Sequence, residues 1–134
     1  MRRVLFLAAL VCVAALTGTA QDSVKVDPKH YKVELENAQV RVVRISYGPH
    51  EKSVMHSHPA GVVTFLTDSK FKFTYPDGKA EQSTGKAGET RWMDASTHLP
   101  ENLSDKPAEA IYVELKAKPA AKAAAKAPAK KKAS

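Results

Sequence analysis

The stretch Phe71-Lys72-Phe73-Thr74-Tyr75-Pro76-Asp77-Gly78-Lys79 decides the fold class of this chain. Residues 71–75 alternate aromatic and polar side chains, and a period of two places the three rings on one face of a β-strand. Asp77-Gly78 then predicts a tight turn, because two-residue hairpin turns need positive φ angles. We therefore expect a β-hairpin whose second strand covers residues 79–84. Its three rings either form barrel core or line a pocket.

The same period of two recurs outside the hairpin. Residues 31–35 and 40–42 alternate, and residues 110–115 end the series. Residues 61–66 form a nearly continuous, β-branched apolar run, as expected for a strand buried on both faces. Turn signals such as Gly48-Pro49 and Ala87-Gly88 separate these runs at short intervals. Many short strands without a helical pattern predict an all-β sandwich or barrel.

Both ends of the 134-residue chain differ from its middle. Residues 1–20 combine two arginines, an apolar run and a small-residue end at Ala20, which predicts a secretory signal peptide cleaved before Gln21. Residues 116–134 contain only lysine, alanine and proline besides the last serine, so we expect a disordered tail. One domain at residues 21–115 remains, and we expect a periplasmic or secreted protein without a transmembrane segment after cleavage.

The charge and the single cysteine exclude several classes of protein. The formal net charge is +7, but two arginines lie in residues 1–20 and seven lysines in residues 116–134. Residues 21–115 thus hold 12 of the 21 basic residues and all 14 acidic ones, a net charge of about −2. This does not favour a specific nucleic-acid-binding domain. Because Cys12 lies in the expected signal peptide, the mature protein would have neither a disulfide nor a thiolate ligand.

Three of the five histidines are candidates for one shared site. His56 and His58 stand two residues apart at the expected start of a strand, where residues i and i+2 project from the same face. Their imidazoles would point at one volume and could share a metal ion. His98 lies on another expected strand. We expect His30 to be a surface residue, and His50 to be exposed or to support the site from behind.

The surroundings of these histidines resemble two motifs of the cupin family. Residues 48–58 contain a glycine, a short spacer and His56-Ser57-His58, as in the first motif. Residues 88–102 contain a glycine, a strand, a turn, His98 and, four residues later, Asn102, as in the second. The resemblance covers about residues 26–115 and is narrowest to small single-domain cupins of bacteria. It implies a double-stranded β-helix, or jelly-roll barrel, in which the three histidines bind a divalent metal ion.

The chain departs from the cupin pattern at several positions. A glutamate ligand usually follows the second histidine by four or five residues, where this chain has Val62 and Val63. The proline and glycine that usually precede the last histidine are replaced by Asp94 and Ser96. Glu101 is the carboxylate nearest to His98 in sequence, but an i+3 residue faces the opposite side of a strand. The usual anionic ligand is therefore missing.

The resemblance leaves two functions open. The protein is either a metal-dependent enzyme of the dioxygenase or isomerase type, or a non-catalytic barrel that binds a metal, a sugar or a small acid. Iron, zinc, manganese, nickel and copper all remain candidates. An enzyme would need a general acid or base, for which the sequence offers His50, Glu51 and Glu101.

Beyond a small-molecule ligand, two kinds of partner remain open. Small cupins often pair, so a homodimer is expected from the resemblance. The lysine-rich tail either keeps the protein soluble or contacts an anionic envelope polymer or lipid.

Overall fold

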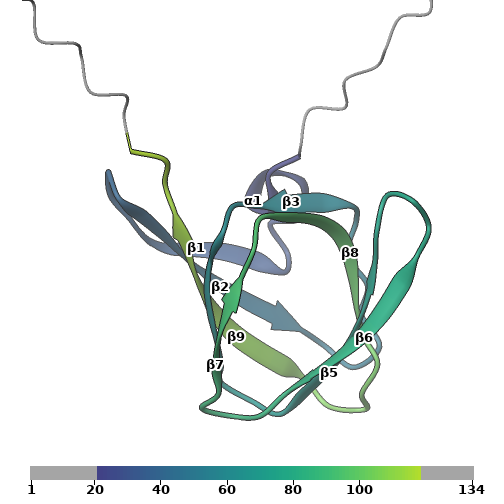
Figure 1. Cartoon of the computed structure of the whole chain (residues 1–134). Coiled ribbons are helices and arrows are strands. Elements are labelled where there is room, and N and C mark those ends of the chain that lie inside the picture. The colour runs from purple at the N-terminus through teal and green to yellow at the C-terminus, as the bar shows by residue number, and fades with distance from the viewer. Residues whose placement is uncertain (1–20, 119–134) are drawn as a thin grey trace, which may run out of the picture.

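Two antiparallel sheets face each other in the computed structural model, which describes residues 21–118 (Figure 1). The expected signal peptide and residues 119–134 of the expected tail lie outside this part of the chain. The first sheet has the order β1 (Tyr31–Glu36), β2 (Val40–Tyr47), β9 (Ala108–Leu115), β4 (Gly61–Phe65) and β7 (Thr90–Met93). The second has the order β3 (His56–His58), β8 (Ser96–Asn102), β5 (Ser69–Thr74) and β6 (Ala80–Gly85). A short helix, α1 (Ser23–Val26), precedes β1.

The order of the strands gives a jelly roll. Apart from the hairpins β1–β2 and β5–β6, each successive strand crosses to the opposite sheet, so the chain winds as a double-stranded β-helix. The expected all-β class is confirmed. Among residues 21–118, no helix is long and apolar enough to cross a membrane.

The predicted hairpin is confirmed. β5 and β6 pair in antiparallel register, the Tyr75 amide donates to the Lys79 carbonyl, and Gly78 has a φ of 84°. The expectation for residues 61–66 is wrong in one respect. β4 alternates buried and half-buried residues, because only one of its faces is turned to the barrel interior.

Two small clusters of buried side chains form the core. Tyr31, Val43 and Tyr47 pack together in one of them. Val63, Ala110 and Tyr112 form the other. A hydrogen bond joins the segments of the two cupin-like motifs: the side-chain amide of the buried Asn102 donates to the Gly48 carbonyl at 2.9 Å. Strand β8, which carries His98, pairs with β3, which carries His56 and His58.

Candidate metal site

Strands β3 and β8 bring three buried histidines together on the inner face of the barrel. His56 and His58 share one face of β3, and His98 is the register partner of His56 on β8. The three rings have centroid separations of 4.8, 5.4 and 5.4 Å. One ligand atom from each lies within 4.8 Å of the others. The three histidines thus lie close together, as the i, i+2 spacing and the second motif led us to expect.

Hydrogen bonds behind the rings decide which nitrogens face one another. Nδ1 of His56 lies 2.8 Å from the Val54 carbonyl oxygen, and Nδ1 of His58 lies 3.0 Å from Glu114 Oε1. Both partners are acceptors, so in the neutral rings each Nδ1 carries the proton and each Nε2 carries a lone pair. The two Nε2 atoms are 3.1 Å apart. At this separation, one metal ion could accept the lone pairs of both nitrogen atoms.

The donor set fits a transition metal. Two imidazole nitrogens at about 2.0–2.1 Å from one zinc ion lie roughly 3 to 3.4 Å apart, which agrees with the 3.1 Å observed. Burial is the main cause that lowers the pKa of His56 to about 4 and that of His98 to about 3, and the neighbouring histidines lower both values further. Both rings therefore stay neutral near pH 7, the form in which an imidazole binds a metal.

Glu114 is the site residue that the sequence interpretation missed. It is 1% exposed on the inner face of β9, where it accepts from His58 and from Arg41 Nε at 2.5 Å. Arg41 in turn lies 2.7 Å from Asp22. Burial alone would raise the pKa of Glu114, but the hydrogen bonds of His58 and Arg41 outweigh it and hold this pKa below its ordinary value. The result is a carboxylate that orients a ligand histidine from behind.

Glu114→Gln should weaken metal binding about 10- to 100-fold, because the orienting carboxylate makes the ligand ring a better donor. The glutamine is almost isosteric, so the barrel should stay folded. Cobalt(II) affinity, measured by competition with a chelator, checks this. Glu109→Gln on the outer side of the same strand is the matched control. Equal affinities for both variants would contradict a role of Glu114 in the site.

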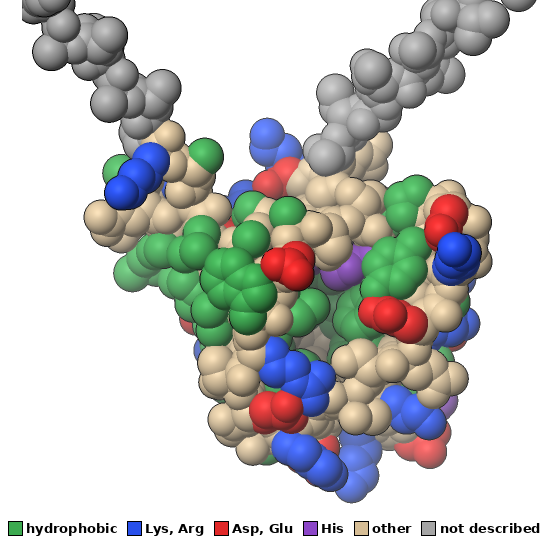
Figure 2. All heavy atoms as spheres, in the orientation of Figure 1, with side chains coloured by type: hydrophobic (Ala, Val, Ile, Leu, Met, Phe, Trp, Pro, Cys, Tyr) green, Lys and Arg blue, Asp and Glu red, His purple; other side chains and the backbone are tan. Residues whose placement is uncertain are grey.

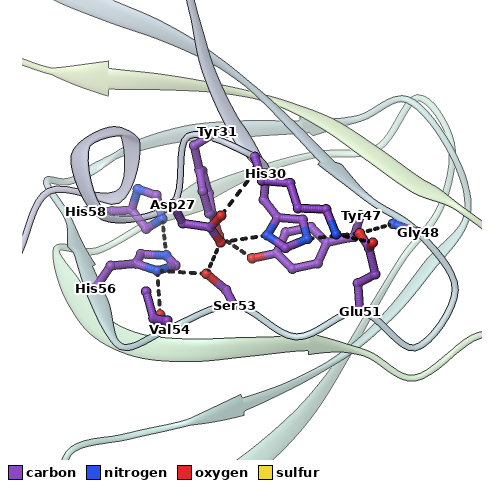
Figure 3. Close-up of polar contacts among 11 residues, drawn as sticks. Asp27, His30, Tyr31, Tyr47, Gly48, Glu51, Ser53, Val54, His56 and His58 are labelled. Carbon is purple, nitrogen blue, oxygen red and sulfur yellow. Dashed lines mark hydrogen bonds and ion pairs between the residues drawn. The ribbon is translucent and has the colours of Figure 1, made fainter.

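A second polar network supports His56 from the other side (Figure 3). The Ser53 hydroxyl lies 3.4 Å from His56 Nδ1 and donates to Asp27. Asp27 lies 2.6 Å from Nδ1 of His30, and Glu51 lies 2.9 Å from Nε2 of the same ring. The network thus runs from the back of His56 to the surface near Glu51.

The surface position expected for His30 is therefore wrong. Its side chain is 5% exposed, because two carboxylates hold both ring nitrogens and the ring stacks on Tyr47 at 4.1 Å. The sequence around His30 did not predict its burial, because turns in the chain bring the two acceptors, Asp27 and Glu51, to its ring.

The remaining candidates lie away from the three histidines. His50 is exposed, which is one of the two positions expected for it, and its side chain pairs with Asp105. Glu101 pairs with Lys72, on the side of β8 that its i+3 spacing predicts. Hydrogen bonds from Lys29, the Gly48 amide and His30 lower the pKa of Glu51 to about 2 and keep it as a carboxylate.

A cavity of about 100 Å³ opens beside His58 and His98. In the space-filling view, a histidine is visible in the hollow between hydrophobic side chains (Figure 2). Aromatic and aliphatic side chains form most of the wall, and they include Ile45, Val63, Phe65, Phe71, Phe73, Met93 and Tyr112. The site therefore has a polar histidine end and an apolar body.

Comparisons with known proteins agree with this architecture. No protein-family model matches the sequence, and no curated protein matches it. A cupin domain protein of Bordetella pertussis Tohama I is 24% identical, with 65% of this chain and 92% of that chain covered and a TM-score of 0.60. A protein of Klebsiella pneumoniae with a double-stranded β-helix domain is 20% identical, with 63% and 74% covered and a TM-score of 0.51.

The strand order and these likenesses define a barrel of the double-stranded β-helix class. Within that class the chain has the cupin fold, as its two motifs predicted. Because the sequence identities are below 25%, these likenesses show the fold alone. The function has to be argued from the residues of the site.

Proposed function

We propose that this protein binds one divalent transition-metal ion through His56, His58 and His98 and receives a small molecule beside it. The 3.1 Å approach of the Nε2 atoms of His56 and His58 carries the proposal, because both Nδ1 atoms face acceptors. When both rings are neutral, two lone pairs at this distance repel each other, whereas a shared cation attracts both. Imidazole ligands suit zinc, iron, copper and nickel, and manganese to a lesser extent.

A divalent ion held there would act as a Lewis acid on an oxygen atom of the bound molecule. An enzyme of the dioxygenase or isomerase type also needs a general acid or base close by. Glu51 and Glu101 instead form ion pairs with Lys29 and Lys72, away from the cavity. This favours binding over catalysis. Oxygen consumption or product formation with a molecule that binds would support the enzyme as the second candidate.

Cobalt(II) titration of the full chain tests the metal site. The protein is purified without a histidine tag and stripped with a chelator before the titration. One equivalent per chain should bind with a visible absorption band of nitrogen and oxygen ligands, and metal analysis after gel filtration should give the same stoichiometry. Absence of saturable binding at one equivalent would overturn the proposal.

We also propose that the protein is exported to the periplasm or secreted. The two arginines, the apolar run and the small residues before Gln21 support this, and they lie outside the described residues. In that setting the lysine-rich tail would meet an anionic envelope polymer or lipid.

A further inference from the structure

The segment around α1 packs against the strand that carries two of the three histidines. α1 lies beside β3 (Figure 1), and Asp22 forms a parallel β-bridge with Ser57, the residue between the two histidines of that strand. The Ser57 amide donates to the Gln21 carbonyl at 2.7 Å. Residues 21–26 are therefore in backbone contact with the histidine strand, although they are far from it in sequence.

The two carboxylate oxygens of Asp22 have different partners. Oδ1 accepts from the backbone amides of Val24 and Lys25 at 3.1 and 3.2 Å and so caps α1. Oδ2 lies 2.7 Å from Nη2 of Arg41. Burial alone would raise the pKa of Asp22, but the hydrogen bond and charge of Arg41 and the two amides outweigh it and hold this pKa below its ordinary value. Asp22 thus serves the helix with one oxygen and Arg41 with the other.

Arg41 connects Asp22 with Glu114. It is the register partner of Glu114 on β2, and its side chain is 15% exposed. Its Nε donates to Oε2 of Glu114 at 2.5 Å, while its Nη2 is held by Asp22. Because a guanidinium group is planar and rigid, carboxylates at two of its nitrogens fix its orientation as well as its position. Without Asp22, the group can turn about its remaining hydrogen bond.

Glu114 connects Arg41 with His58. Because Oε2 is taken by Arg41, Oε1 is left for Nδ1 of His58 at 3.0 Å. This contact keeps the proton of the neutral ring on Nδ1 and the lone pair on Nε2, the atom that faces His56. The orientation of the His58 ring is therefore set by a series of side chains that begins at Asp22.

We infer that Asp22 is a positioning residue of the metal site, which acts on His58 through Arg41 and Glu114. The inference deepens the proposed function and rests on it for the metal, whereas the orientation of the His58 ring is also a property of the metal-free protein. Metal affinity would then depend on a residue outside both cupin-like motifs. The rival role, that of a helix cap alone, predicts no effect on the site as long as the cap remains.

Asp22→Asn and Asp22→Ser separate the two roles. Asparagine and serine cap helices as well as aspartate does, but neither offers Arg41 a negative charge. Both variants should bind cobalt(II) about 3- to 10-fold more weakly than the wild type, a smaller loss than that expected for Glu114→Gln. Glu34→Gln is the matched control, because it takes a carboxylate from Arg44 on the opposite face of β2, and it should bind like the wild type. Circular dichroism checks that each variant folds.

A double variant tests whether Asp22 acts through Glu114. Adding Asp22→Asn to Glu114→Gln should cause no further loss of cobalt affinity, because the series of contacts is already broken at Glu114. Two losses that add would show that Asp22 affects the site by another route, and would overturn the inference. Wild-type affinity in both Asp22→Asn and Asp22→Ser would overturn it as well.

The metal-free protein separates this inference from the metal proposal. Nitrogen NMR of the His58 ring at about pH 8, where an ordinary imidazole is neutral, shows which ring nitrogen carries the proton. The wild type should hold the proton on Nδ1, and Asp22→Asn should populate both tautomers. If cobalt fails to bind to the wild type, the tautomer decides: a shift in Asp22→Asn supports the positioning role, and no shift overturns it.

Discussion

Replacing His56 and His98 together with alanine should abolish the binding of one cobalt(II) ion per chain. The change removes two of three imidazoles whose ligand atoms lie within 4.8 Å of one another. His58 alone then remains, and a single imidazole holds a divalent ion weakly. Cobalt titration followed by metal analysis after gel filtration measures the loss. Wild-type stoichiometry in the double variant would exclude this cluster as the binding site.

Two further variants keep this result interpretable. His56 is fully buried and bonds to the Val54 carbonyl, so its loss can also weaken the barrel. Among the described residues, His98 has a single weak side-chain hydrogen bond, to Ser96 at 3.3 Å, so His98→Ala should fold and still lose most of its cobalt affinity. His50→Ala removes an exposed imidazole and should bind like the wild type. Circular dichroism of all variants reports whether the barrel is intact.

The sequence predicted the fold well because several strands carry their own local signal. The alternation at residues 71–75 and the glycine at position 78 depend on neighbours in the chain, and both appear as expected in β5 and its turn. The i, i+2 spacing of His56 and His58 is equally local, so their common face was predictable. His98 needed the second motif, because only the pairing of β8 with β3 brings it close.

Glu114 could not be predicted because β9 shows two competing phases. The larger apolar residues Ile111, Val113 and Leu115 favour a strand with Glu114 turned outward. The structure has the opposite phase: the small Ala110 and the buried Tyr112 face inward with Glu114, and Leu115 is 43% exposed. A lone acid in an apolar strand was the available signal. Its partners, Arg41 and His58, come from distant segments.

Gly61→Ala should destabilise the barrel by about 3 kcal/mol, because the backbones of β4 and β9 meet closely at this point. A Cβ on residue 61 would lie 2.2 Å from the Val113 carbonyl oxygen and 3.1 Å from Glu114 Cα. Backbone atoms in a paired sheet cannot move aside as a side chain can, so β4 must shift away from β9. The change should also weaken cobalt binding, since it displaces the carboxylate behind His58.

Urea unfolding followed by circular dichroism measures the effect. About 3 kcal/mol is a large share of the 5–15 kcal/mol that stabilises a typical domain, so the midpoint should fall clearly. Gly78→Ala is the matched control. It lies at a φ of 84° with nothing within 4 Å of the added carbon, so it should cost only about 1 kcal/mol from backbone strain. Equal midpoints for wild type and Gly61→Ala would contradict the close approach of β4 and β9 on which the position of Glu114 depends.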